Sequence, residues 1–223
     1  GRSAVVIVEQ QGGMLLMALD LVVVLCLAVQ FAIACYFLYL IYWLFELPPA
    51  VPETPAAGQD LPRVLVQIPV YNEPLVVERA LSAAAALDWP ADRLTIQLLD
   101  DSTDITSDIA VLAVARLCRA GKDVVHVRRA DRSGFKAGAL NYVLSQTAPD
   151  AKVIGVIDSD YEVRPDWLKA LVPYFDDRKI GYVQAPQDHR DWTGDRFKEM
   201  LNWEYAGFFD IGMCLRNEYD AII

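Results

Sequence analysis

Residues Leu21 to Phe45 form an uninterrupted run without a charged side chain, which dominates the first part of the chain. A helix needs roughly 20 apolar residues to cross the hydrocarbon core of a bilayer. Helices in the cores of soluble domains are rarely so long and so uniformly apolar. Aromatic residues that suit a membrane–water boundary gather at its C-terminal end: Tyr36, Tyr39, Tyr42 and Trp43. We therefore expect an N-terminal tail over residues 1–13 and one transmembrane helix over residues 14–46.

The net charge of the chain limits its partners. Lys and Arg number 20 against 30 Asp and Glu, which gives a formal charge of -10. Such a chain repels the phosphates of nucleic acids, so we expect no nucleic acid as a partner. It also repels anionic headgroups, so contact with the lipid bilayer has to come from apolar insertion. An anionic small ligand can bind only where a basic cluster or a metal ion reverses the overall sign.

A Pro-rich linker over residues 47–61 precedes a segment in which apolar strands alternate with helices. We expect strands over residues 63–70, 94–99, 124–127, 152–157 and 180–184. We expect helices over residues 74–87, 105–120, 137–145 and 196–215, and one more that begins at Pro165. This alternation is typical of an α/β fold with a mostly parallel sheet covered on both faces. Ligands bind such sheets beyond the carboxyl ends of the strands.

Two polar clusters follow the first two expected strands. The first is PVYNEP, residues 69–74, and the start of a helix with Asn72 as its cap explains most of it. The second is DDSTD, residues 100–104, in which Ser102 or Asp104 could simply cap the next helix. Its adjacent carboxylates repel each other unless they are solvated, protonated or bound to donors or cations. One of them could instead accept hydrogen bonds from a ribose hydroxyl or a base N–H.

The sharpest cluster is Asp158-Ser159-Asp160, directly after the apolar strand VIGVI. Two carboxylates spaced by one residue can share Mg²⁺ or Mn²⁺, and that cation can bridge the oxygens of a substrate diphosphate. The alternative is a polar turn. Between the second and third clusters lies the most basic stretch, RRADRSGFKAG, residues 128–138. It could neutralise phosphates ahead of a helix N-terminus, or it could be a solvated basic turn.

Taken together, IPVYNEP, LLDDSTD, RSGFKAGALN and VIDSD, in this order, resemble the family 2 glycosyltransferases. The cellulose-synthase-like, inverting and often processive branch fits best, over roughly residues 63–220. The resemblance implies a GT-A fold, a Rossmann-like, mostly parallel sheet, over residues 62–223, truncated at the C-terminus. It further implies a UDP-sugar donor, with glucose as a guess, Mg²⁺ or Mn²⁺ as cofactor, and a growing polysaccharide as acceptor. The catalytic domain would lie on the cytoplasmic side of the inner or plasma membrane.

The resemblance also assigns roles to single residues. Tyr71 and Glu73 would lie beside the nucleotide, and Asp100 or Asp101 would contact uracil or ribose. Lys136 would approach the diphosphate, and Asp158 and Asp160 would bind the metal, with Asp158 also in the donor site. The general base belongs to a later motif that is expected beyond residue 223, so no catalytic residue is assigned here. The acceptor motif QxxRW is missing too, because residues 187–192 imitate it with one residue too many. We therefore expect this chain to bind donor but to transfer poorly or not at all.

Two other interpretations stay open. A membrane-tethered, non-catalytic nucleotide-sugar-binding or scaffold subunit would have the same sheet. A haloacid-dehalogenase-type phosphatase also has an apolar strand followed by DxD, with Asp158 as its nucleophile. The motif comes late in the strand series for that class, however, and Tyr161-Glu162 replace its usual small residues. A dinucleotide-dependent oxidoreductase is disfavoured because no GxGxxG follows any expected strand.

Overall fold

The computed structural model describes residues 2–46, 60–144 and 150–214. The chain forms two compact units, one made of residues 51–183 and the other of residues 1–50 and 184–223. The first unit contains the sheet, and the second contains the long apolar helix and the last helices. Of the expected linker over residues 47–61, residues 47–59 lie outside the described part of the chain.

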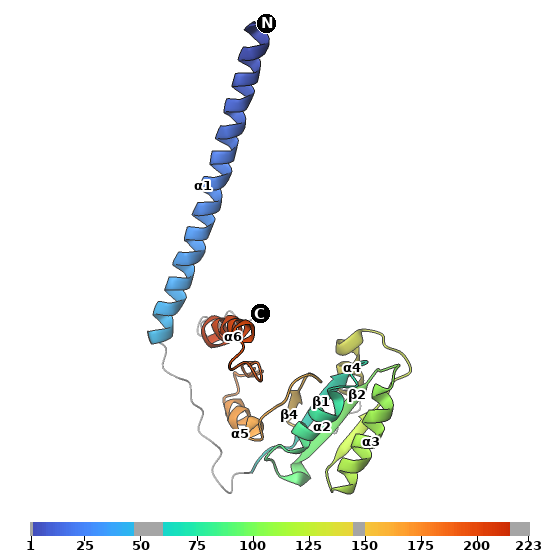
Figure 1. Ribbon diagram of the computed structural model, residues 1–223. Coiled ribbons are helices and arrows are strands. Elements are labelled where there is room, and N and C mark those ends of the chain that lie inside the picture. The colour runs from blue at the N-terminus through green and yellow to red at the C-terminus, as the bar shows by residue number, and fades with distance from the viewer. Residues whose placement is uncertain (1, 47–59, 145–149, 215–223) are drawn as a thin grey trace. The chain divides into compact units, whose positions relative to one another are not determined.

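The first unit is built on a parallel four-stranded sheet with the order β3-β2-β1-β4 (Figure 1). The strands are β1 (Val64–Val70), β2 (Leu94–Asp100), β3 (Val124–Val127) and β4 (Val153–Val156). The register pairs Val70 with Asp100 and Gln67 with Val156. The backbone pairing continues past β4, where Ile157 N donates to Gln67 O at 3.0 Å. The segments that follow β1, β2 and β4 therefore leave the sheet along the same edge.

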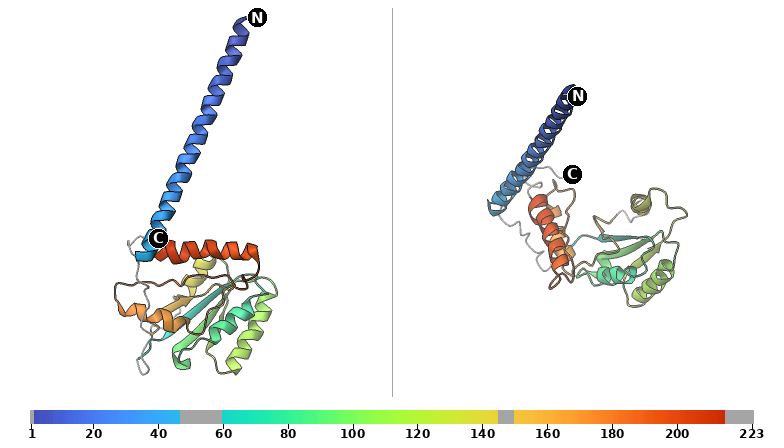
Figure 2. Two further views of the ribbon diagram at one scale, coloured as in Figure 1. Left: turned by 60° about the vertical axis from the view of Figure 1, so that its left-hand side comes forward. Right: turned by 45° about the horizontal axis from the view of Figure 1, so that its top comes forward.

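Helices cover both faces of this sheet. The right-hand view of Figure 2 shows α4 (Phe135–Leu144) on one side and α2 (Val77–Ala85) with α3 (Thr106–Arg119) on the other. Alternate residues of β1, from Val64 to Val70, are buried in the core that α2 and α3 share. Leu99 of β2 belongs to a smaller core with Ala139 and Val143 of α4. Each such side chain contributes about 1.5–3 kcal/mol when fully buried, so period-two patterning of the strands fixes which helix covers which face.

Residues 180–184, expected as a fifth strand, form no strand in the structure, so that expectation is wrong. Ile180 N donates to Asp177 O at 3.0 Å, which closes a turn instead of extending the chain. Gly181 and Tyr182 are both exposed. Before this turn come η1 (Ala91–Arg93), α5 (Trp167–Leu171) and η2 (Val172–Asp176), of which α5 and η2 pack into the larger core through Leu168 and Val172.

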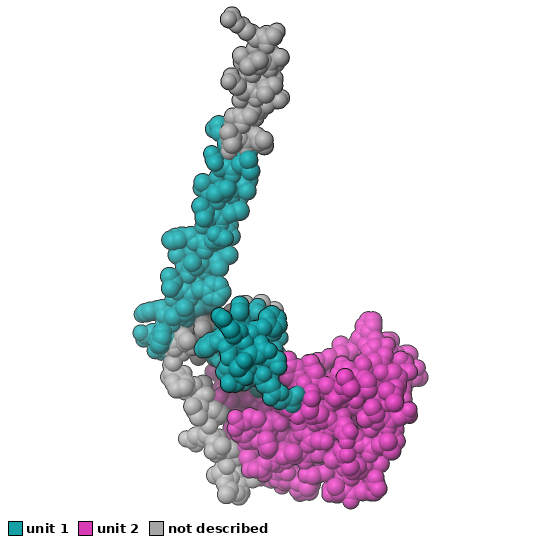
Figure 3. Space-filling model, in the orientation of Figure 1, with its two compact units in different colours: residues 1–50, 184–223 teal, residues 51–183 magenta. Residues whose placement is uncertain are grey.

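The second unit holds helix α1 (Arg2–Glu46), part of which is coloured teal with its unit in Figure 3. The helix begins at Arg2, so it includes residues 2–13, which the sequence suggested as a separate tail. Its segment Met17–Tyr42 contains an 18-residue window with a mean hydropathy of 2.7 and no buried residue, and the segment has the length and composition of a membrane span. The expected helix over residues 196–215 is found as α6 (Arg196–Ala206) and the π-helix η3 (Gly207–Met213). The Asp195 side chain caps α6 by accepting hydrogen bonds from Phe197 N and Lys198 N.

Candidate functional site

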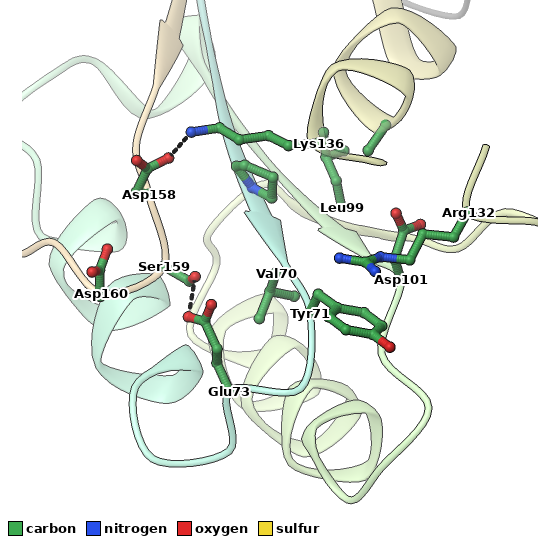
Figure 4. Close-up of a pocket in the computed structure, with 12 residues that line it drawn as sticks. Val70, Tyr71, Glu73, Leu99, Asp101, Arg132, Lys136, Asp158, Ser159 and Asp160 are labelled. Carbon is green, nitrogen blue, oxygen red and sulfur yellow. Dashed lines mark hydrogen bonds and ion pairs between the residues drawn. The ribbon is translucent and has the colours of Figure 1, made fainter. Parts of the chain in front are cut away.

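A cavity of about 320 Å³ opens where β1, β2 and β4 end and α4 begins (Figure 4). It therefore lies beyond the carboxyl ends of parallel strands, where α/β sheets bind ligands, and its volume is in the range of small-molecule sites. Its walls combine apolar residues with charged ones of both signs. They are formed by Pro69, Val70, Tyr71, Glu73, Leu99, Asp101, Arg132, Lys136, Ala139, Asp158, Ser159 and Asp160.

Asn72 fixes the loop that carries Tyr71 and Glu73 into the cavity. Its backbone is left-handed, with φ 55°, a conformation that asparagine tolerates better than most residues. Its N–H donates to Ser102 Oγ at 3.0 Å, and its Oδ1 accepts from Thr103 N at 2.9 Å. The suggestion that Asn72 caps the next helix is thus wrong, because Val76 holds the N-cap position of α2. Asn72 instead joins the loops after β1 and β2.

The structure separates Asp100 from Asp101, which the sequence left as alternatives. Asp100 is 1% exposed and does not line the cavity. Its carboxylate accepts from Ser102 N at 2.8 Å and Ser107 Oγ at 2.7 Å, and His126 Nε2 lies 2.9 Å from Oδ2. Burial alone would raise the pKa of Asp100, but the hydrogen bonds from His126, Ser102 and Ser107 outweigh it and hold the pKa well below its ordinary value. Asp100 therefore organises the loop below the cavity.

Asp101 does line the cavity, and Arg129 holds it there. Arg129 Nε and Nη2 donate to Asp101 Oδ1 and Oδ2 at 2.8 and 2.6 Å, which is a bidentate pair. Both side chains are less than one-tenth exposed. The pair removes the charge repulsion expected between Asp100 and Asp101, because each carboxylate has its own partners. Asp101 is thus the better placed of the two to meet a ligand.

Lys136, Asp158 and Asp160 line another part of the same cavity. Figure 4 shows Lys136 and Asp158 pointing toward each other from α4 and the loop after β4, and they form an ion pair. Between the two aspartates, buried Ser159 donates to a Glu73 carboxylate oxygen. This hydrogen bond ties the loop after β4 to the loop after β1. The side chains of Glu73, Lys136, Asp158 and Asp160 that the sequence singled out therefore line one cavity.

The carboxylates that line the cavity are the type of ligand that binds a divalent cation arriving with a diphosphate. No group of three or more His, Cys, Asp and Glu side chains that could hold a metal occurs in the described part of the chain. Mg²⁺ is commonly held by one or two carboxylates and completes its coordination with water and substrate phosphates. Asp158 and Asp160 supply two carboxylates beside a cationic Lys136, which matches that pattern. If Asp158 and Asp160 held a metal, the rest of its ligands would have to come from substrate and water.

Arg132 and Ser159 are cavity residues that the sequence analysis did not assign. The Arg132 guanidinium carbon lies 3.3 Å from the centroid of the Tyr71 ring and 5.1 Å from that of Phe135. The basic stretch had pointed to this loop without showing which arginine faces a ligand. In the structure Arg128 Nη2 donates to Ser102 O at 2.7 Å and Arg129 binds Asp101, whereas Arg132 reaches the cavity. Arginines spaced this closely in an irregular loop have no periodicity from which their directions could be predicted.

Comparison with known proteins places these features in a family. The profile of "Glycosyl transferase family 2" matches residues 65–221. Glucomannan 4-beta-mannosyltransferase 1 of Cyamopsis tetragonoloba is 37% identical over 131 residues, which are 57% of this chain and 25% of that protein. Probable glucomannan 4-beta-mannosyltransferase 3 of Oryza sativa subsp. japonica is 41% identical over 127 residues, 56% of this chain and 23% of that protein. The chain thus spans about a quarter of the length of these relatives.

A solved structure supports the same assignment. Mannosyltransferase PcManGT from Pyrobaculum calidifontis, in complex with GDP-Man and Mn²⁺, aligns with a TM-score of 0.53 and 29% identity. The alignment covers 70% of this chain and 44% of that one. The parallel sheet of the first unit is thus a GT-A-like fold, as expected, and these comparisons give the phosphatase interpretation no support. The family profile covers most of the sequence, including the three polar clusters and the basic stretch between the second and third of them. The chain therefore belongs to glycosyltransferase family 2.

Proposed function

We propose that this chain is the donor-binding part of a membrane-attached hexosyltransferase that uses a nucleoside-diphosphate sugar to extend a polysaccharide. One observation carries the proposal. Two cations, Lys136 and Arg132, and two carboxylates, Asp158 and Asp160, line the same cavity at the carboxyl edge of the sheet. A diphosphate needs positive charge in an acidic chain, and these two cations, with a metal held by the two aspartates, would supply it.

The residues that line the cavity have different roles in this proposal. Lys136 and Arg132 neutralise diphosphate oxygens, and Asp101 accepts hydrogen bonds from the base or ribose. Tyr71 and Glu73 lie beside the nucleotide, and Ser159 keeps Glu73 in place. When bound, a divalent cation supplies Lewis-acid stabilisation of the departing nucleoside diphosphate. None of these cavity residues is assigned as the general base that deprotonates the acceptor hydroxyl, so this chain alone would be inactive or poorly active.

For the donor, the relatives favour mannose from GDP-mannose over the glucose and UDP expected from the sequence. The sequence relatives are named mannosyltransferases, and the solved structure of PcManGT contains GDP-Man. The acceptor would be a growing β-glycan, since the relatives are named for glucomannan. Helix α1 would anchor the protein in the lipid bilayer of the inner or plasma membrane, with the sheet unit on the cytoplasmic side.

Calorimetry on the detergent-solubilised chain tests the proposal. GDP, UDP, GDP-mannose and UDP-glucose are titrated with and without Mn²⁺ or Mg²⁺. We expect nucleotide binding only in the presence of the metal, with Kd values of roughly 1 μM to 1 mM, which correspond to a binding free energy of about 4–8 kcal/mol. The guanine nucleotides should bind more tightly than the uridine nucleotides. Asp158→Ala with Asp160→Ala should weaken this binding about tenfold or more, about 1.4 kcal/mol.

The matched control is Asp176→Ala with Asp177→Ala, which removes the same charge from an exposed turn. The control should bind as the wild type does. Metal-dependent binding that survives unchanged in the Asp158 and Asp160 variant would contradict the proposed site. Tighter binding of uridine nucleotides would restore the original expectation for the donor while leaving the site intact.

A further inference from the structure

Arg129 makes more hydrogen bonds than its neighbours Arg128 and Arg132, yet it does not line the cavity. Besides the bidentate pair with Asp101, its Nη1 donates to Ser133 O at 2.7 Å and its Nη2 to Phe135 O at 2.8 Å. One guanidinium therefore binds the loop after β2 and both ends of the turn before α4. The hydrogen bonds to Asp101 raise the pKa of Arg129 above its ordinary value, so it stays charged in this setting.

The turn that Arg129 binds has an unfavourable backbone. Gly134 has φ 69°, and Phe135, a bulky residue, has φ 49°. A left-handed conformation outside glycine costs on the order of 1–3 kcal/mol and persists only where the surroundings enforce it. Here the carbonyl groups on either side of Gly134 both accept hydrogen bonds from one guanidinium. Arg129 thus supplies part of the force that holds this turn.

Gly138 shows that α4 is fitted closely against this arrangement. A Cβ atom at position 138 would overlap the Ser133 carbonyl oxygen and lie 2.7 Å from Arg129 Nη1. Gly138 N also donates to Gly134 O at 2.8 Å, which starts α4 directly from the turn. The guanidinium, the turn and the first turn of α4 therefore pack as one body, which we call the Arg129 bracket (Asp101, Arg129 and residues 133–138).

We propose that Arg129 is a positioning residue for donor binding, which acts by holding Asp101 and the Arg132–Lys136 turn in place at the cavity. This inference rests on the proposed function, because it assigns the means by which that site is kept in shape. Lys136 directly follows Phe135, whose carbonyl Arg129 binds, and Arg132 directly precedes Ser133. A change in the turn would displace both cations, and release of Asp101 would leave its buried charge without a partner.

Lysine cannot replace Arg129 in this role. A planar guanidinium can donate to a carboxylate through two parallel N–H groups and still reach carbonyl groups with its remaining hydrogens. An ammonium is a point charge with three donors and cannot reproduce that fork. Arg129→Lys thus keeps the charge and removes the geometry. We expect it to weaken binding of Mn²⁺ with GDP or UDP about tenfold or more, about 1.4 kcal/mol.

The experiment measures calorimetric Kd values for Mn²⁺ with GDP and with UDP on the whole chain in detergent. Arg119→Lys is the control, because Arg119 Nε donates only within its own helix in the described contacts, to Ala115 O at 3.2 Å. A Kd for Arg129→Lys within twofold of the wild type would overturn the inference. The same change is then made together with Lys136→Met. If Arg129 acts through Lys136, Arg129→Lys should weaken binding less in the Lys136→Met protein than in the wild type. An equal increase in Kd in both proteins would contradict this inference.

Hydrogen exchange without nucleotide separates this inference from the proposed function. In Arg129→Lys, and not in Arg119→Lys, amides of residues 101–103 and 133–138 should exchange faster, because the bracket is broken. If the wild type binds no nucleotide but these amides respond, the bracket stands and the proposed function fails. If they do not respond, the bracket is wrong. Gly138→Ala changes the same bracket at a residue of α4. If Arg129→Lys and Gly138→Ala both fail to fold, Arg129 is a residue needed for stability and the inference is overturned.

Discussion

Asp100 and Asp101 are adjacent in sequence, but their carboxylates have different partners and only Asp101 lines the cavity. Asp100 lies beneath the loop with His126, Ser102 and Ser107 around its oxygens, whereas Asp101 faces the cavity beside Arg129. A buried carboxylate with full hydrogen bonding is retained as an anion, because protonation would break bonds that the folded loop has already formed. Asp100 should therefore matter for stability and Asp101 for ligand binding.

Asp100→Asn should lower the free energy of unfolding by about 3 kcal/mol at pH 7, because it removes a buried charge from its hydrogen-bond donors. The pKa of Asp100 is lower in the folded state than its ordinary 3.8, so the unfolded chain binds more protons as the pH falls through that range. The stabilisation is complete above about pH 5 and is lost progressively below it. Urea unfolding of wild type and variant should show similar differences in the free energy of unfolding at pH 7 and 5 and a smaller difference at pH 3. Exposed Asp92→Asn is the control, and a pH-independent difference would contradict the argument.

At the scale of elements, much of the fold followed from the sequence and part of the site did not. Four apolar strands and the helices between them were predictable because buried strands and amphipathic helices have distinct periodicities. The carboxyl-edge location of the site followed from the parallel order of these strands. Asn72 and Arg129 were not predictable as loop-bridging residues, because their partners are 30 or 31 and 28 positions away in sequence. The strand expected at residues 180–184 failed because a short apolar run does not specify a pairing partner.

Strand β4 positions the two aspartates through its packing on α5. A Cβ atom on Gly155 would lie 3.0 Å from two ring atoms of Trp167, tighter than ordinary contact. We expect Gly155→Val to cost about 1–3 kcal/mol of stability by overpacking, and to weaken Mn²⁺-dependent nucleotide binding because Asp158 lies three residues further on. Thermal unfolding and calorimetry would measure both effects. Val156→Ala, at a half-exposed neighbouring position, should change either quantity little, and a Gly155→Val protein with wild-type stability would show that β4 has room to move.

The whole molecule combines a strongly acidic chain with one very apolar helix. Electrostatic attraction to anionic lipids cannot hold a chain with a formal charge of -10 at a membrane surface. In the proposed function, attachment therefore depends on Met17–Tyr42, whose side chains are exposed along nearly the whole segment. Their burial in lipid would remove from water an apolar surface that extends along nearly the whole segment. The chain should accordingly stay in the membrane fraction after high-salt and alkaline washes, and detergent should release it.

Arginine substitutions within α1 test this attachment without disturbing protein packing. Leu27 and Phe31 are 58% and 72% exposed in the structure, so their replacement removes few contacts within the chain. Each arginine near the centre of a membrane-spanning helix costs about 2.5–3.5 kcal/mol on insertion scales, so Leu27→Arg with Phe31→Arg should move the chain into the alkaline-wash supernatant. Leu27→Val with Phe31→Leu keeps the segment apolar and should leave the chain in the pellet. Retention of the double arginine variant in the pellet would mean that another part of the chain, and not α1, holds the protein at the membrane.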